Sequence, residues 1–461
     1  MREVDVVVIG LGPGGEDVAG RLAEAGIDVV GVEARLVGGE CPYYACVPTK
    51  MMIRAADSLA QARQVRELAG SARVEADWGP VAARVRDEAT DDWDDTVAVR
   101  RLEGKGATVV HGRGRITAPG EVTVTTADGE QVFRARRGIV LNPGTEPAVP
   151  PVDGLAGTPF WTNREAVATR VVPESLVVFG GGPVGCEFAQ VFSRFGSSVT
   201  IVQAADRLLP ADEPESGDLV AAVFEREGIT VRLGASARRV SHDGTAFSVS
   251  LGDATVATVT AAQVLVAAGR RTDLAALGVA AVGIDDSGRG ITVDERLRAA
   301  DGVWVIGDVT GRGAFTHTSM YQARIAAADI LGATSATDAE VADYRAMPRV
   351  TFTDPEIGSV GLTEAAARST GLTVRVGTAT VASSTRGFIH KVGNDGFVKL
   401  VEDADRGVLV GATSAGPVGG EVLGALALAV HAEVPTATLR RMIYAYPTFH
   451  RTIESALADL S

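Results

Sequence analysis

Residues 6–15 read VVVIGLGPGG, four apolar residues that run directly into a Gly-x-Gly-x-x-Gly turn. The residues after the turn fit a helix through Ala23, and a second apolar strand over residues 27–32 ends at Glu33. A strand, a glycine turn, a helix, a strand and an acidic residue in this order are typical of a dinucleotide-binding unit. The sequence therefore predicts a Rossmann-type α/β unit at this end of the chain.

Each glycine of this turn has a physical task. Gly10 permits the tight turn, Gly12 lets the backbone approach a pyrophosphate, and Gly15 lets the helix pack closely on the strand. The helix then presents the positive end of its dipole to the phosphates. Glu33 would accept a hydrogen bond from a ribose hydroxyl.

The same pattern recurs further along the chain. Residues 176–179 read LVVF and lead into GGGPVG at residues 180–185, and a strand over residues 199–202 ends before Gln203. The first glycine and the acidic position are 23 residues apart in both copies. We therefore expect a second Rossmann-type unit.

Two such units indicate two bound dinucleotides, with a relay of electrons between them as the natural use. One would be a tightly held flavin and the other an exchangeable nicotinamide. The alternative is a duplicated fold with one inactive site, but the second turn keeps all three glycines, Gly180, Gly182 and Gly185.

The acidic position of the second unit holds Gln203. A carboxylate there would favour the free 2′-hydroxyl of NADH and repel the 2′-phosphate of NADPH. Glutamine removes the repulsion, and Arg207 is near enough in sequence to supply a cation. The sequence leans towards NADPH, with NADH left open.

A pair of cysteines follows the first unit. Residues 41–50 read CPYYACVPTK, and the chain has one other cysteine, Cys186. A redox-active dithiol beside a flavin is the favoured interpretation. A zinc site would need two further ligands nearby, and a structural disulfide closing so short a loop would constrain the unfolded chain little.

The whole chain sets limits on class and partners. Its 461 residues predict several domains, and 54 glycines suit an α/β protein rich in tight turns. A net charge of −14 argues against nucleic acid or an anionic membrane as a partner. Three cysteines suit a reducing cytosol, and the first residues lack the apolar region of a signal peptide, so we expect a soluble cytoplasmic protein.

Six further segments extend the pattern in a fixed order, namely 38–41 (GGEC), 46–50 (CVPTK), 185–189 (GCEFA), 268–270 (AGR), 305–308 (VIGD) and 352–356 (FTDPE). With them the chain resembles, over nearly its whole length, the flavin-dependent pyridine nucleotide–disulfide oxidoreductases. This family contains lipoamide dehydrogenase, glutathione reductase and mercuric reductase.

The resemblance implies an α/β fold with two Rossmann-type dinucleotide-binding domains and a C-terminal α+β dimerisation domain. Residues 1–145 and 273–345 would hold FAD, residues 146–272 the nicotinamide nucleotide, and residues 346–461 the interface of a homodimer. The active site would be shared across that interface.

The resemblance also implies roles for individual residues. Cys46 would be the thiol beside the flavin, forming a charge-transfer pair, and Cys41 the outer thiol that meets the substrate. Lys50 would lie by flavin N5 and pair with Glu187. The chemistry of the residues agrees in part, because a cysteine near a helix start and a lysine has a lowered pKa. An ordinary solvated lysine is the alternative for Lys50.

Further residues are assigned to the cofactors by the same resemblance. The FAD set, in which Asp308 would bind the ribityl chain, is Gly10, Gly12, Gly14, Gly15, Glu33, Gly39, Lys50, Gly114, Gly144, Asp308 and Thr316. The NAD(P) set is Gly180, Gly182, Gly185, Gln203, Arg207, Gly269 and Arg270. From the residues alone, Asp308 also reads as a turn-forming aspartate and Cys186 as a small buried apolar residue.

The sequence departs from the family in one place. The disulfide reductases carry a His-Pro-Thr segment with a glutamate three residues after the threonine. The corresponding residues 444–451 read YAYPTFHR, so Tyr446 takes the histidine position and Arg451 the glutamate position. A phenol, with a pKa of about 10, is almost never a base at pH 7. An efficient lipoamide or glutathione reductase is therefore not expected.

Two arrangements would compensate for the missing histidine and glutamate. Pro447 suits the first turn of a helix, which would place His450 and Glu454 on one face as a displaced acid–base pair; the alternative is a surface or interface pair. Tyr43 and Tyr44 would line a pocket for an aromatic or quinone-like substrate, or simply pack the cysteine loop. His317 is expected to pack near the flavin site.

The prediction is an FAD-dependent NAD(P)H oxidoreductase that passes electrons through the Cys41–Cys46 disulfide to an unidentified small-molecule acceptor. Direct transfer from the flavin to a quinone or another oxidant is one alternative, and an FAD-stabilised interaction subunit is another. No metal site is predicted. No cysteine follows Cys186, so the sequence does not support the mercury reduction of mercuric reductases, in which a C-terminal cysteine pair passes the metal to the inner thiols. The catalytic candidates are Cys41, Cys46, Lys50, Glu187, Tyr446, His450 and Glu454.

Overall fold

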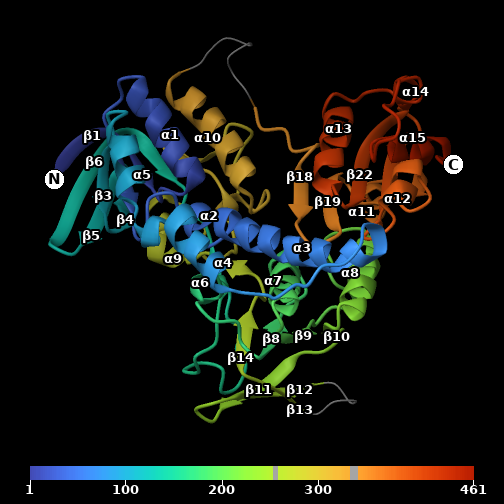
Figure 1. Ribbon diagram of the computed structural model, residues 1–461. Helices are drawn as coiled ribbons and strands as arrows, with labels where there is room; N and C mark the ends of the chain where they lie inside the picture. Colours follow the sequence, from blue (N-terminus) through green and yellow to red (C-terminus); the bar gives the residue numbers. More distant parts are fainter. Residues whose placement is uncertain (253–257, 333–340) are drawn as a thin grey trace. The chain divides into compact units, whose positions relative to one another are not determined.

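The structure is a computed structural model that describes residues 1–252, 258–332 and 341–461 (Figure 1). The chain forms two compact units, each assembled from three separate segments. The first comprises residues 1–48, 83–147 and 270–343, and the second comprises residues 49–82, 148–269 and 344–461. Both mix helices with sheets, so the predicted α/β class is confirmed.

The first unit is built on a largely parallel sheet with the strand order β16-β17-β6-β1-β2-β3. Its strands are β1 (Arg2–Ile9), β2 (Val29–Glu33), β3 (Thr108–His111), β6 (Gly129–Leu141), β16 (Arg298–Ala300) and β17 (Val303–Val305). Strands β4 (Arg113–Ala118) and β5 (Glu121–Thr126) extend from β6 as an antiparallel pair. Both faces of the central strand β1 are buried, because Val6 and Val8 lie in one core and Val4 and Val7 in the other.

Helix α1 (Pro13–Glu24) follows β1 and packs beside helix α10 (Thr316–Ile330), which Figure 1 shows in gold next to the blue α1. The close approach is possible because Gly14 has no side chain. A Cβ on Gly14 would lie 2.0 Å from Ser319 Oγ. Helix α5 (Thr96–Glu103) contributes Leu102 to the same core.

The second unit contains a parallel four-stranded sheet with the order β10-β9-β8-β14. Its strands are β8 (Ser175–Phe179), β9 (Ser198–Val202), β10 (Thr230–Arg232) and β14 (Gln263–Val266), and its helices include α7 (Pro183–Arg194) and α8 (Pro214–Arg226). An antiparallel sheet of β11 (Ala237–His242), β12 (Phe247–Leu251) and β13 (Thr258–Ala261) follows. Helix α3 (Cys46–Leu68) contributes most of its length to this unit.

The C-terminal part of the second unit is a five-stranded antiparallel sheet with the order β18-β19-β22-β21-β20. The strands are β18 (Pro348–Thr351), β19 (Glu356–Gly361), β20 (Val374–Thr380), β21 (Phe397–Asp403) and β22 (Val408–Gly416). Helices α13 (Gly419–His431) and α15 (Arg451–Ala458) close one face with Leu423, Leu426 and Leu457. Shorter helices are α11 (Glu364–Ser369), α12 (Thr385–His390) and α14 (Thr436–Leu439).

One buried cation joins four segments of the second unit. Arg194, at the end of α7 and 5% exposed, contacts Asp57 at 2.6 Å, Glu227 at 2.6 Å and Asp354 at 2.8 Å. Burial raises the pKa of the Asp57 carboxyl to about 6, in spite of the attraction of Arg194. The guanidinium therefore compensates carboxylates that would otherwise be destabilised by burial and by one another.

No helix in the three described ranges combines the length and the apolar character that crossing a membrane requires.

Candidate active site

The first glycine turn has the shape that a pyrophosphate needs. Gly10 has φ of +92°, and a Cβ there would lie 2.1 Å from Asn142 O. A Cβ on Gly15 would lie 1.9 Å from Gly10 O, whereas one on Gly12 would have its nearest neighbour, Asn142 Nδ2, at 3.3 Å. Two glycines are thus required by close packing, and the middle one leaves the backbone approachable at the start of α1. The turn fits a dinucleotide.

Glu33 ends β2 and supports this turn. Its Oε2 accepts a hydrogen bond from Leu11 N at 2.8 Å, and its Oε1 accepts one from Arg35 N at 2.8 Å. Burial raises the pKa of the Glu33 carboxyl, although the two backbone donors favour the ionised form. A carboxylate oxygen has room for a second donor, so these bonds are compatible with a ribose hydroxyl.

Asp308 lies at the carboxyl end of the same sheet, after β17, with Thr145 as its partner. Thr145 Oγ1 donates to Asp308 Oδ2 at 2.5 Å, and Arg270 Nε donates to Thr145 Oγ1 at 2.6 Å. Arg270 also donates to Thr145 O and lies 3.8 Å from Glu40. Arg270, predicted to lie along the nicotinamide nucleotide, therefore makes its contacts inside the first unit.

The sequence did not point to the residues that hold the backbone in place at this carboxyl end of the sheet. Asn142 accepts from Ser319 Oγ at 3.0 Å and donates to Gly10 O at 3.3 Å, and Gln322 Oε1 accepts from Gly307 N at 2.6 Å. The only local signal was a polar residue, Asn142, directly after the apolar end of β6.

Apart from Lys50, which belongs to the second unit, the remaining predicted FAD residues lie in the first unit as well. Gly39 has φ of +69°, and a Cβ there would lie 2.8 Å from Gly12 Cα. Gly114 in β4 packs against Ile9, Gly144 has φ of +63° with open space, and Thr316 begins α10. These positions surround the glycine turn or lie in the segments that follow strands of the sheet.

Cys46 is the first residue of α3, and Cys41 lies in the short helix α2 (Glu40–Tyr43). Cys46 is exposed and Cys41 is half-buried. Cys46 Sγ lies 3.4 Å from Thr316 Oγ1, so the dithiol segment contacts α10 within the first unit. A helix N-terminus stabilises a thiolate, and a hydroxyl can donate to it.

Lys50 and Glu187 form an ion pair inside the second unit. Lys50 Nζ lies 2.8 Å from Glu187 Oε2 and 4.6 Å from the centre of the Phe352 ring. Glu187 is buried on α7, and its Oε1 accepts from Phe352 N at 2.9 Å. Because the carboxylate is fixed from two sides, the ammonium has a defined position one helical turn after Cys46 on α3. A freely solvated Lys50 is excluded.

The two tyrosines of the cysteine loop make packing contacts. Tyr43 is buried and donates to Val37 O at 3.1 Å, and burial raises the pKa of its hydroxyl to about 12. The Tyr44 ring stacks on Trp93 with centroids 6.4 Å apart, and Trp93 Nε1 donates to Tyr43 O. The packing interpretation therefore accounts for both rings.

The second glycine turn repeats the first in the second unit. Gly180 has φ of +111°, a Cβ on Gly185 would lie 2.0 Å from Gly180 O, and Gly182 has open space around it. Gln203 Oε1 accepts from Gly181 N at 3.0 Å, as Glu33 does from Leu11 in the first turn. This turn also fits a dinucleotide.

Two arginines flank Gln203. Gln203 Nε2 donates to Arg207 O at 3.3 Å, and Gln203 N donates to Arg232 O at 2.9 Å. The Nε atoms of Arg207 and Arg232 are both buried without a hydrogen-bond partner among the described residues. Sequence reasoning found Arg207 but not Arg232, which comes close only because β10 pairs with β9. Gly269, with φ of +116°, ends this part of the second unit.

The C-terminal segment differs from the sequence expectation. Helix α15 begins at Arg451, so the expected helix start at Pro447 is wrong. Arg451 lies 3.0 Å from Glu454 and 5.2 Å from the centre of the Tyr446 ring, which is 64% exposed. Glu454 is thus paired with arginine, and among the described atoms no hydrogen bond joins it to His450. An acid–base role of His450 and Glu454 stays a prediction.

Three further sequence interpretations meet the structure here. Cys186 is buried, donates to Gly181 O at 3.4 Å and has a raised pKa because of burial, which confirms the packing interpretation. The His317 ring stacks on Phe315 with centroids 5.2 Å apart. In the part of the chain that the structure describes, no three His, Cys, Asp or Glu side chains gather as a metal site.

Known proteins are similar to this chain in sequence and fold. Residues 4–323 match the pyridine nucleotide-disulphide oxidoreductase family, and residues 347–457 match the dimerisation domain of that family. The chain is 34% identical to the dihydrolipoyl dehydrogenase of Chlorobaculum tepidum, over 99% of this chain and 97% of the relative. It is 31% identical to the mercuric reductase of Acidithiobacillus ferrooxidans, over 97% and 81%. The Cu(II) complex of the HOCl-induced flavoprotein disulfide reductase RclA from Escherichia coli has a TM-score of 0.86 at 27% identity, covering 99% of both chains.

Proposed function

Because this chain belongs to the pyridine nucleotide-disulphide oxidoreductase family, whose members use FAD and NAD(P)H, we propose that it reduces an acceptor through a Cys41–Cys46 dithiol without imidazole catalysis. FAD, when bound, supplies the two-electron chemistry that couples NAD(P)H to the dithiol. The glycine turns at Gly10 and Gly180 would hold the two nucleotides, the first with Glu33 and Asp308 and the second with Gln203.

The two thiols have separate tasks in this proposal. The Cys41 thiolate attacks one sulfur of an acceptor disulfide, forms a mixed disulfide and releases the first thiolate of the acceptor. The Cys46 thiolate then attacks Cys41 Sγ, closes the Cys41–Cys46 bond and releases the second thiolate. The start of α3 and Thr316 Oγ1 favour the thiolate of Cys46.

The contacts of Tyr446 with Arg451 and Glu454 support one class of acceptor. The Tyr446 phenol and the Arg451 guanidinium stack on each other, and Glu454 is bound to Arg451. This trio contains no imidazole, the side chain that usually serves as acid and base in proton transfer, so a leaving thiol would receive little help from it. The suitable acceptors are those whose reduced form leaves without a proton, namely aromatic disulfides or metal ions. The Cu(II) complex of the similar RclA is consistent with the last class.

Introducing the histidine and the glutamate of the family at positions 446 and 451 tests this proposal. We expect wild type to reduce dithiobis(nitrobenzoate), whose thiolate leaves readily, at least about tenfold faster than lipoamide, an aliphatic disulfide. Tyr446→His combined with Arg451→Glu should raise lipoamide turnover by about 10²-fold, the usual contribution of a general acid–base group, and change the aromatic disulfide rate little. The measurement is kcat with both acceptors. Equal rates for the two acceptors in wild type would contradict the proposal.

The coenzyme preference has its own test. We propose that Arg207 and Arg232 favour the 2′-phosphate of NADPH, because Gln203 leaves that position without a negative charge. Arg207→Gln is expected to lower kcat/KM for NADPH by about tenfold and leave NADH nearly unchanged. Arg238→Gln, an exposed arginine of β11 in the same unit, is the matched control. A similar loss with both coenzymes would show that Arg207 does not read the phosphate.

The dimerisation domain matched by residues 347–457 supports a homodimer. We propose that the Tyr446 segment of one chain completes the site at Cys41 of the other, as the resemblance implies. Direct transfer from the flavin to quinones is the competing function, and variants of Cys46 separate the two.

A further inference from the structure

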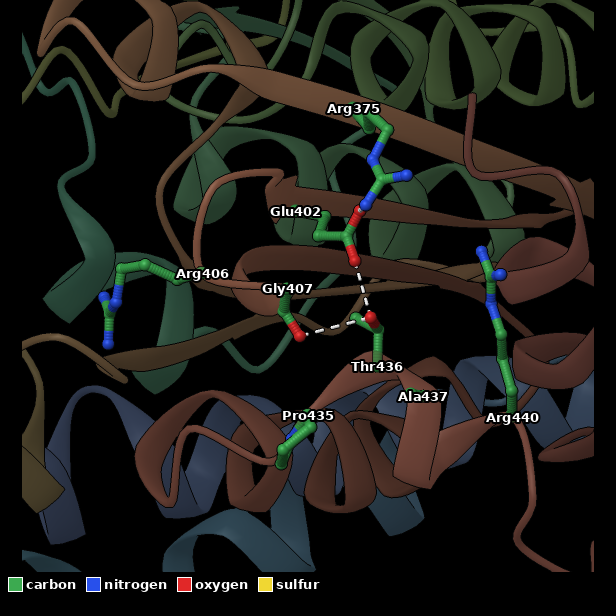
Figure 2. A pocket seen from close by; sticks show the side chains of 8 residues that line it. All are labelled: Arg375, Glu402, Arg406, Gly407, Pro435, Thr436, Ala437 and Arg440. Carbon is green, nitrogen blue, oxygen red and sulfur yellow. Dashed lines mark hydrogen bonds and ion pairs between the residues drawn. The ribbon is translucent and has the colours of Figure 1, made fainter.

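A cavity of about 510 Å³ opens in the C-terminal part of the second unit (Figure 2). It lies between the ends of β20 and β21 and the segment of α14. Its lining residues are Arg375, Glu402, Arg406, Gly407, Pro435, Thr436, Ala437 and Arg440. None of them belongs to the glycine turns, the dithiol or the Tyr446 segment.

Three guanidinium groups reach this cavity from three segments. Arg375 comes from β20, Arg406 from the turn between β21 and β22, and Arg440 from the end of α14. Arg406 lies 2.5 Å from Glu433, which stands outside the lining. Arg440 makes no ion pair with any described residue. The lining therefore carries three positive charges and one negative charge.

The negative charge serves to position Arg375. Glu402 is fully buried, and its Oε2 lies 2.7 Å from Arg375 Nη2. Its Oε1 accepts from Thr436 Oγ1, which also donates to Gly407 O at 3.2 Å, as the dashed lines of Figure 2 show. Arg375 Nε is buried and finds no hydrogen-bond partner among the residues that the structure describes. Glu402 thus holds the Arg375 guanidinium at Nη2, while the Nε donor makes no hydrogen bond to a described residue.

We propose that this cavity binds a small ligand through a compact dianion, such as the phosphate group of a phosphate monoester. The planar donor forks of arginine match the oxygens of phosphate and bind them bidentately. A net charge of −14 repels anions from most of the surface, and the positive charge of this concave surface attracts them locally.

Titration calorimetry with inorganic phosphate tests the proposal. The protein is used full-length, loaded with FAD and saturated with NADP⁺, so that both glycine turns are occupied, and ionic strength is held constant with chloride. We expect one phosphate per chain in the cavity. Arg440→Gln should raise the Kd by about tenfold or more, since a hydrogen bond to a charged group is lost. Arg441→Gln is the matched control, with the same charge change one residue outside the lining.

A second variant keeps the test independent of one side chain. Arg375→Gln should weaken phosphate binding as Arg440→Gln does, and circular dichroism of both variants should match wild type. Unchanged phosphate affinity in both folded variants would overturn the proposal. Equal weakening by Arg441→Gln would overturn it too, because only the net charge would matter. Binding of malonate without binding of phosphate would replace the phosphate assignment by a dicarboxylate.

Discussion

Cys46→Ser is expected to lower the turnover of dithiobis(nitrobenzoate) by at least about a hundredfold, because a serine hydroxyl can neither close the disulfide with Cys41 nor act as a thiolate. Cys46 begins α3 and contacts Thr316 Oγ1 at 3.4 Å, the surroundings of a stabilised thiolate. Serine is close to cysteine in size, and Cys46 is exposed, so little effect on folding is expected.

The measurement is kcat with the aromatic disulfide and with a benzoquinone, at saturating NADPH. Quinone reduction in Cys46→Ser should be retained, since a quinone can be reduced without a thiol. Cys186→Ala is the control, because Cys186 is buried beside Gly181 and plays no part in the proposal. If Cys46→Ser reduces the disulfide as fast as wild type, electrons leave directly from the flavin and the dithiol mechanism is wrong.

Arg194→Met is expected to lower the free energy of unfolding by about 3–5 kcal/mol, the usual cost of leaving buried charges unpaired. Arg194 is 5% exposed and compensates Asp57, Glu227 and Asp354 at once. Methionine fills part of the volume but supplies no charge. The three carboxylates would then repel one another in a site where burial already raises the pKa of Asp57 to about 6.

The check is the thermal midpoint of the FAD-loaded protein at pH 7.5, expected to fall by about 5–10 °C. Arg226→Met is the matched control on the neighbouring helix. Arg226 is 55% exposed and pairs with Asp395 at the surface, so its loss should cost less than about 1 kcal/mol. Part of the Arg194→Met loss should return at pH 5, where Asp57 is largely protonated. Equal midpoints for the two variants would show that the Arg194 cluster does not stabilise the unit.

The parts that could be predicted from the sequence are those set by local spacing. The two glycine turns and the acidic positions after them occupy the expected strand ends, because close backbone contacts admit only glycine at Gly10, Gly15, Gly180 and Gly185. The family, its fold class and its cofactors were predicted from the resemblance of short motifs along the chain and are confirmed. The Lys50–Glu187 contact followed from the family resemblance rather than from spacing.

Local spacing placed one helix start wrongly. The expected start at Pro447 is wrong, because α15 starts at Arg451, and that guanidinium engages both Glu454 and the Tyr446 ring. The acid–base role of His450 and Glu454 stays a prediction. The signal was present in the sequence, since Arg451 and Glu454 are three residues apart and suit a helical ion pair.

By itself, the sequence determined two glycine turns that fit dinucleotides and a segment with two cysteines, because each is written in residues close together in the chain. The loss of the usual acid–base pair stays a prediction. Only the tertiary structure decided the contact of Thr145 with Asp308, the arginines around Gln203, the four segments joined at Arg194 and the cavity at Arg440. These groups meet because helices and strands far apart in sequence pack together in the fold. Strand order is set by burial of the whole core, and no local pattern records it.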